Sequence, residues 1–333
     1  MHGGNIFEIA RAHGWDWREI ADFSASINPL GPAPGVAPAI CSAMGRIVHY
    51  PDRHSVRLRQ VLSQAWNISE DQIMAGNGAT ELIFFIARMF APGKVTVATP
   101  AFQEFHRAFN NAAPARLDRP GTWPKDGLLC LTSPANPTGS TVSLEALERH
   151  LQTSAGATLI DESFIEYSGL ASAVALLRRY PQLMVLRSLT KFYALPGLRV
   201  GALVASLELL RKWRLHREPW QVSVLAEEAA ITALNDTEHA SRSLEFVSSE
   251  RAWLREQLTS ISGIEPLASH TNFLYVPLEY QPAALAQHML KYKILIRDCS
   301  HWPGLSGPAI RIAVRRRDEN LRLLNAWREF QCA

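Results

Sequence analysis

The feature that most constrains the fold is an alternation of short apolar runs with segments of helical pattern, between about residues 70 and 205. The apolar runs are predicted strands at residues 73–75, 94–98, 128–131, 157–160, 183–186 and 200–204. Runs that are apolar along their whole length are typical of strands buried on both faces of a sheet that helices cover. The pattern therefore predicts an α/β fold with a mainly parallel central sheet in a large domain.

A second group of elements follows a long helical stretch near residues 207–260. Its predicted strands cover residues 272–276, 294–297 and 309–314, and its predicted helices lie near residues 282–291 and 318–330. We expect these elements to form a smaller α+β domain beside the sheet, together with an N-terminal arm. The 333 residues suffice for two domains. The expected division is an arm with part of the small domain at 1–50, a large domain at 51–235 and a small domain at 236–333.

Composition and charge narrow the classes of partner. The chain carries 34 basic and 31 acidic side chains, with a formal net charge of +3, so no strongly basic balance favours nucleic acid. Its four cysteines, Cys41, Cys130, Cys299 and Cys332, lack the spacing of a metal site or a disulfide framework. Neither a signal peptide nor a run of roughly 20 apolar residues is evident. We therefore expect a soluble protein of the reducing cytoplasm, with no metal, nucleic acid or membrane as partner.

The most specific motif is Ser188-x-x-Lys191, which continues as x-x-x-L-P-G-L-R to Arg199. A lysine directly after an apolar strand is unusual, because lysine resists burial unless it has a task. A desolvated lysine amine can attack a carbonyl carbon, while a serine hydroxyl and an arginine fork suit a phosphate group. A carbonyl and a phosphate occur together in pyridoxal phosphate (PLP). The short S-x-x-K motif alone is also compatible with an incidental lysine in a loop, but the longer string favours PLP.

A glycine-rich turn, Gly76 to Thr80, opens an apolar helix after the first predicted strand. Backbone N–H groups at a helix N-terminus form an anion site. We expect Gly78 to permit close approach of the phosphate, Ala79 to donate its backbone N–H and Thr80 to add a hydroxyl. Such a turn is often merely structural, so the expectation depends on its combination with Ser188 and Arg199.

Three further residues suit the ring of PLP. Asp161 ends an apolar strand, where a carboxylate would be costly to bury without a partner, and it could hold the pyridine nitrogen in its protonated form. Asn136, within PANPTG, could donate to the phenolic oxygen, and Phe102 could stack on the ring face. A plain turn at PANPTG and a core position for Phe102 are the alternatives.

Taken together, the order and spacing of these motifs resemble the fold-type I PLP-dependent enzymes, the aspartate aminotransferase superfamily. The resemblance implies a homodimer with active sites at the subunit interface, and catalysis by Lys191 and Asp161. It also implies that Tyr50 reaches the cofactor phosphate of the partner subunit and that Arg311 grips a substrate carboxylate. One position departs from the family pattern: Phe164 stands where a tyrosine usually assists on the phenolic oxygen.

Within the superfamily the chain resembles two related branches, the histidinol-phosphate aminotransferases and the threonine-phosphate decarboxylases of cobalamin synthesis. The opening H-G-G-N, the segment around Asn28 and the string DESFIEY favour the decarboxylases, and Arg297 matches the arginine that both branches use on a substrate phosphate. The substrate-binding residues implied by the resemblance are His2, Gly3, Asn28, Asn136, Arg297 and Arg311. The expected reaction is decarboxylation of L-threonine O-3-phosphate to (R)-1-amino-2-propanol phosphate. An aminotransferase of the histidinol-phosphate type is the alternative, and a non-catalytic protein on the same fold is the third.

Overall fold

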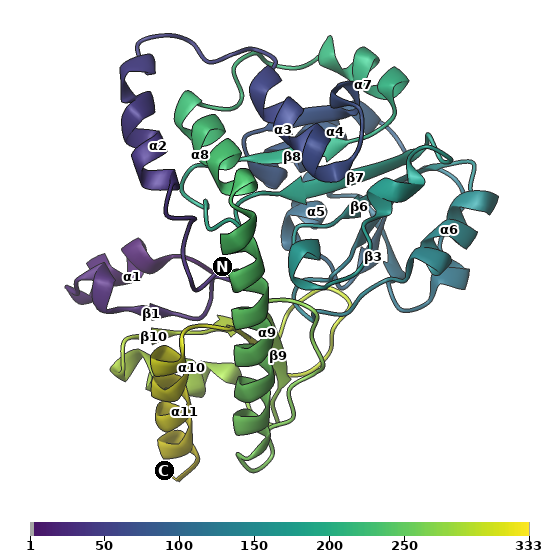
Figure 1. The fold of residues 1–333 in the computed structure, drawn as a ribbon. Coiled ribbons are helices and arrows are strands. Elements are labelled where there is room, and N and C mark those ends of the chain that lie inside the picture. The colour runs from purple at the N-terminus through teal and green to yellow at the C-terminus, as the bar shows by residue number, and fades with distance from the viewer. Residues whose placement is uncertain (1–2, 333) are drawn as a thin grey trace.

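The computed structural model describes residues 3–332 and contains a central sheet of seven strands in the order β2-β8-β7-β6-β5-β3-β4 (Figure 1). The strands, in sheet order, are β2 (Ile73–Gly76), β8 (Gly201–Val204), β7 (Leu183–Ser188), β6 (Ala157–Asp161), β5 (Leu128–Thr132), β3 (Val95–Thr99) and β4 (Ala113–Arg116). Strand β8 runs antiparallel to both of its neighbours, whereas the pairs from β7 to β4 are parallel. The predicted α/β fold with a mainly parallel sheet is confirmed.

The two faces of this sheet contribute to different parts of the core. On strand β5, Leu128 and Cys130 pack in one apolar cluster, and Leu129 and Leu131 pack in another on the opposite face. This follows from the strand geometry, in which successive side chains point to opposite faces. Helices α4 (Gly78–Phe90), α5 (Gln103–Ala108) and α7 (Leu207–Arg214) contribute to the first cluster, and α6 (Leu144–Thr153) to the second.

Strand β4 was not predicted, and its burial explains why. It lies at the edge of the sheet, and of its residues only Ala115 is half-buried while the others are exposed. An edge strand needs no apolar run and tolerates the proline at position 114. The hydrophobic pattern used for the other strands therefore gave no signal here.

Helices α2 (Val36–Ala43), α3 (Val56–Trp66) and α8 (Val224–Asn235) form a further layer with β2 and β8. Short 3₁₀ turns complete the connections. They are η1 (Trp17–Glu19), η2 (Met44–Arg46), η3 (Glu70–Gln72), η4 (Pro120–Thr122), η5 (Ile165–Tyr167) and η6 (Ala173–Leu176).

A smaller antiparallel sheet has the order β11-β12-β9, with β9 (Phe273–Pro277), β12 (Ala309–Ala313) and β11 (Arg297–Asp298). Helices α9 (Thr237–Thr259), α10 (Pro282–Lys291) and α11 (Arg317–Cys332) cover it. Figure 1 shows α9 running from beside α8 down past β9 to the level of α11. Leu254, Leu274 and Trp327 are buried in the apolar core between the smaller sheet and these helices.

The N-terminal segment joins this second group. After α1 (Ile6–His13), strand β1 (Ala21–Asp22) pairs in parallel with β10 (Ile294–Leu295). The strand expected at 294–297 is therefore two strands, because residues 294–295 pair with β1 and residues 297–298 pair with β12. Within residues 3–332, no helix combines the length and apolar character that crossing a membrane requires.

Candidate active site

A cavity of about 450 Å³ lies where the carboxyl ends of the parallel strands face the smaller sheet. Ligands of parallel α/β sheets bind beyond these strand ends. The cavity brings together most of the residues singled out in the sequence: Gly3, Ala79, Thr80, Phe102, Asn136, Asp161, Ser188, Lys191, Arg199, Arg297 and Arg311. His2 lies outside the described residues.

Lys191 follows β7 in a tight turn and opens onto this cavity. Burial, together with the positive charges of Arg311 and Arg199, lowers its pKa from the usual 10.5 to about 8. A larger fraction of the amine is therefore neutral near physiological pH than for an ordinary lysine. The neutral amine is the nucleophilic form, so Lys191 is suited to bond to a carbonyl carbon.

The residues expected around a phosphate group adjoin one another. Gly78 begins α4 with a φ of 78°, and a Cβ there would lie 2.5 Å from Nη2 of Arg199. Glycine thus allows the guanidinium to approach the helix N-terminus. The hydroxyls of Ser188 and Thr190 lie 2.8 Å apart at the same place. Helix N–H groups, hydroxyls and a guanidinium together fit a phosphate, as the PLP expectation requires.

Asp161 ends β6 and is buried, with 3% of its surface exposed. Its Oδ1 accepts hydrogen bonds from the backbone N–H of Ser163 at 2.9 Å and from the Ser163 hydroxyl at 2.5 Å. Burial raises the pKa of Asp161 to about 6, although the hydrogen bonds from Ser163 oppose this rise. A buried carboxylate that lines a cavity favours a bound group with a positive N–H, as a protonated pyridine nitrogen would supply.

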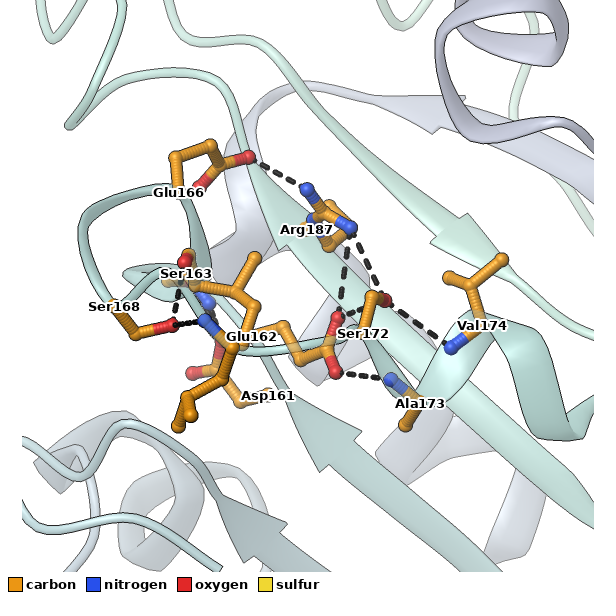
Figure 2. A network of polar contacts seen from close by, with 11 residues as sticks. Asp161, Glu162, Ser163, Glu166, Ser168, Ser172, Ala173, Val174 and Arg187 are labelled. Atoms are coloured by element: carbon orange, nitrogen blue, oxygen red, sulfur yellow. Dashed lines mark hydrogen bonds and ion pairs between the residues drawn. The ribbon is translucent and has the colours of Figure 1, made fainter. Parts of the chain in front are cut away.

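The neighbouring carboxylate, Glu162, is arranged quite differently (Figure 2). It accepts hydrogen bonds from the Ser172 hydroxyl at 2.5 Å and from the Ala173 N–H at 2.6 Å, and it pairs with Arg187 at 3.5 Å. Arg187 in turn binds Glu166 at 2.7 Å. Since Glu162 follows Asp161 and Arg187 precedes Ser188, this buried network links the ends of β6 and β7 behind the cavity.

Two arginines lie opposite each other on the smaller sheet. Arg297 of β11 and Arg311 of β12 are register partners, and they are 8% and 7% exposed. Arg297 donates to Oε1 of Gln103 at 3.0 Å. Arg311 donates to Oδ1 of Asn136 and to the carbonyl oxygen of Ser24, both at 2.6 Å.

Neither arginine has a carboxylate partner within residues 3–332. In the same part of the chain, Nε of Arg311 is buried without a hydrogen-bond partner. Burial lowers the pKa of Arg311 to about 10. Like charges directly opposite each other destabilise a sheet unless something compensates. The pair is therefore suited to bind anionic groups.

The sequence analysis did not single out Ser163 and Trp302, which line the cavity, or Gln103, which accepts a hydrogen bond from Arg297. Trp302 donates its Nε1–H to the carbonyl oxygen of Ala101 at 2.7 Å, and the guanidinium of Arg297 lies 5.4 Å from its ring centroid. A serine two residues after an aspartate is a recognisable turn signal, whereas nothing local indicates that Trp302 meets Ala101.

Two expected site residues, Asn28 and Tyr50, do not line the cavity. The side-chain amide of Asn28 donates to the Phe192 carbonyl oxygen and the Ser243 hydroxyl, and its own N–H donates to the Lys191 carbonyl oxygen. This places Asn28 behind the Lys191 turn and not on the cavity, in contrast to the expected substrate contact. Tyr50 also lies away from the cavity and is 78% exposed.

Phe164, which stands at the usual tyrosine position, lines the cavity and packs edge-on against Phe273 at 5.1 Å between ring centroids. Asn136 accepts from Arg311 through Oδ1, so its amide nitrogen remains the donor for a phenolic oxygen. With no hydroxyl at Phe164, the amide of Asn136 is the donor expected there.

Comparison with known proteins gives relatives along nearly the whole chain. Threonine-phosphate decarboxylase of Salmonella typhimurium is 33% identical, over 98% of this chain and 95% of its own. Histidinol-phosphate aminotransferase 2 of Archaeoglobus fulgidus is 31% identical, over 94% of each chain. The crystal structure of histidinol-phosphate aminotransferase from Sinorhizobium meliloti in complex with pyridoxal 5'-phosphate is 25% identical, with a TM-score of 0.86 over 98% of this chain and 95% of its own.

The sequence also matches the model of the aminotransferase class I and II family over residues 18–326. The chain therefore belongs to this family, with pyridoxal phosphate as its cofactor.

Proposed function

We propose that the protein decarboxylates L-threonine O-3-phosphate to (R)-1-amino-2-propanol phosphate and CO2. The observation that carries this proposal is the pair of buried arginines, Arg297 and Arg311, which face each other without a carboxylate partner in the described chain. The substrate brings two anionic groups, a carboxylate and a phosphate ester. Two adjacent cations match two anions on one small molecule. The 33% identity to a threonine-phosphate decarboxylase supports the same assignment.

Each of the two arginines would bind one of the two anionic groups of the substrate. Arg311 lowers the pKa of Lys191 by its charge and bonds to Asn136, so it lies on the Lys191 side of the cavity. We therefore assign it to the carboxylate, which is attached to the reacting carbon. Arg297, which is stacked near Trp302 and bonded to Gln103, is assigned to the distal phosphate. Arginine suits both anions because its planar fork can donate two parallel hydrogen bonds.

Orientation would decide which bond of the substrate breaks. PLP supplies an electron sink for the bond at Cα that stands perpendicular to its ring. With the phosphate held by Arg297, rotation about the Cα–N bond is restricted, and Arg311 can hold the carboxylate out of the ring plane. The carbon that loses CO2 takes up one proton, and we assign its supply to Lys191 in the protonated, ammonium form. Asp161 would hold the proton on the pyridine nitrogen.

An aminotransferase of the histidinol-phosphate type is the second candidate, because the histidinol-phosphate aminotransferase 2 of Archaeoglobus fulgidus is 31% identical. Histidinol phosphate has a phosphate for Arg297 but no carboxylate, so Arg311 would act only on the keto-acid partner. Product analysis with threonine phosphate, with and without 2-oxoglutarate, separates the two. We expect CO2 and aminopropanol phosphate in both reactions. Release of no CO2, together with transfer of amino groups from histidinol phosphate to 2-oxoglutarate, would favour the aminotransferase.

We also propose that the enzyme is a homodimer in which Tyr50 completes the partner's phosphate site. In support, Tyr50 is 78% exposed, stacks on Trp220 at 4.3 Å between ring centroids, and adjoins Val48, which is also 78% exposed. Mixing Lys191→Ala subunits with Tyr50→Phe subunits should produce hybrids with one intact site and so restore activity lost in both parents. Subunit exchange without any gain in activity, or an active monomer in sedimentation, would refute the shared site.

A further inference from the structure

The two oxygens of the Asp161 carboxylate differ in their hydrogen bonds. Oδ1 accepts both the backbone N–H and the hydroxyl of Ser163, at 2.9 Å and 2.5 Å. No hydrogen bond within residues 3–332 reaches Oδ2, and both Asp161 and Ser163 line the cavity. Two bonds to one oxygen fix the rotation of the carboxylate and leave the other oxygen for a ligand.

Ser163 is also the main local group that favours the anionic form of this carboxylate. The distance of 2.5 Å between Ser163 Oγ and Asp161 Oδ1 is in the range of a charge-assisted O–H···O⁻ bond. Burial raises the pKa of Asp161, and the two hydrogen bonds from Ser163 oppose this more strongly than the charge of Lys191 does. Hydrogen bonds to the charged form stabilise that form.

The adjacent carboxylate, Glu162, has an arginine partner, and Asp161 has none within residues 3–332. Glu162 has a guanidinium, a hydroxyl and a backbone N–H as partners (Figure 2). Its guanidinium partner, Arg187, is shared with Glu166, and no arginine or lysine of residues 3–332 forms an ion pair with Asp161. Within residues 3–332, Ser163 is thus the residue that donates hydrogen bonds to the Asp161 carboxylate.

We propose that Ser163 is a positioning residue, which turns one oxygen of Asp161 toward the ring nitrogen of the cofactor and keeps the carboxylate anionic, so that this nitrogen stays protonated. The inference rests on the proposed role of Asp161. Ser163 would act on the cofactor only through Asp161, and its hydroxyl group would favour the protonated form of the ring nitrogen.

The test compares Ser163→Ala with Ser163→Thr, which keeps the hydroxyl, and with Ser168→Ala as a matched control. The Ser168 hydroxyl lies in the same segment but donates to the Ile165 carbonyl oxygen at 2.7 Å. Apoprotein is loaded with PLP labelled with ¹⁵N in the ring, and the nitrogen shift and the PLP dissociation constant are measured across pH. Circular dichroism of each variant verifies folding.

In Ser163→Ala, the pKa of Asp161 should rise, so the pH below which PLP binding weakens should move upward. At a fixed pH near neutrality we expect affinity to fall about tenfold or more, as for a lost hydrogen bond to a charged group. The ring nitrogen should shift toward its unprotonated value. Ser163→Thr should restore both readouts, and Ser168→Ala should leave both unchanged.

Asp161→Asn distinguishes failure of this inference from failure of the underlying assignment. If Asp161→Asn changes the ¹⁵N shift but Ser163→Ala does not, the role of Ser163 is wrong and that of Asp161 stands. If neither variant changes the shift, the role given to Asp161 is wrong as well. Should Ser163→Ala fail to fold, Ser163→Thr and Ser163→Cys still test it, since only the first retains a hydroxyl donor.

Discussion

The two sides of the cavity differ in how their charges are compensated. At the ends of the parallel strands, Asp161 has Ser163, and the buried Glu162 has Arg187. On the smaller sheet, Arg297 and Arg311 lie opposite each other, and within residues 3–332 their hydrogen bonds go only to neutral oxygens of amides and the backbone. The buried carboxylates of the first side therefore have partners within the protein, while the two arginines of the second side have no carboxylate partner within residues 3–332. We infer that the first side supplies the reactive chemistry and the second selects and orients an anionic substrate.

Because the two sides have different roles, we expect substitutions on them to change different kinetic constants. A change on the strand-end side should reduce turnover for any substrate, whereas a change on the smaller sheet should act mainly on the binding of phosphorylated substrates.

Lys191→Ala should lower kcat by a factor of about 10³ or more, because the variant loses both the nucleophilic amine and the proton donor. PLP should still bind through the phosphate cup around Gly78, Ser188 and Arg199, but without a covalent bond. Turnover assays and absorbance spectra before and after gel filtration measure both effects. A variant with normal turnover would remove Lys191 from the mechanism.

Arg297→Ala should raise KM for threonine phosphate about ten- to hundredfold, since a charge-assisted contact to phosphate is lost. The effect on kcat should be smaller, because PLP and Lys191 are untouched. Arg107→Ala serves as the control: Arg107 also lines the cavity, but it already pairs with Glu104 at 2.9 Å and its side chain is 64% exposed. An equal rise of KM in both variants would contradict a special role of Arg297.

The smallest effect concerns pH. Capture of PLP by the apoprotein requires the neutral Lys191 amine, which predominates above its pKa. Since that pKa is lowered to about 8, the rate of capture should rise with pH to a midpoint near 8. Stopped-flow absorbance gives the profile. A midpoint near the ordinary lysine value of 10.5 would show that the amine is not perturbed as described.

The strand-end side could be predicted from the sequence because each of its groups belongs to a local motif. Lys191, Asp161 and Gly78 each follow or end a predicted strand, and parallel strands bring such positions together without further information. The edge strand β4 escaped prediction for the opposite reason, since it has no apolar run.

The smaller-sheet side depends on tertiary contacts that no local pattern records. The break at Ile296 assigns Arg297 to a different sheet from the residues before it, and the register then sets Arg297 opposite Arg311. Likewise, the Asn28 amide is directed to Ser243, 215 positions away in the sequence, rather than to the cavity. Recognition of a motif could suggest these residues but not their placement.

The most direct test of the account uses threonine phosphate labelled with ¹³C in its carboxylate, incubated with the PLP-loaded enzyme in D2O without any keto acid. If Arg297 and Arg311 orient the substrate as proposed, NMR should show the label appearing as CO2 and bicarbonate. The aminopropanol phosphate formed should carry one deuterium at the carbon that bore the carboxylate. If the label instead stays in a carboxylate group bonded to Cα, and the result is deuterium exchange at Cα or a phosphorylated keto acid, the proposed decarboxylation is wrong.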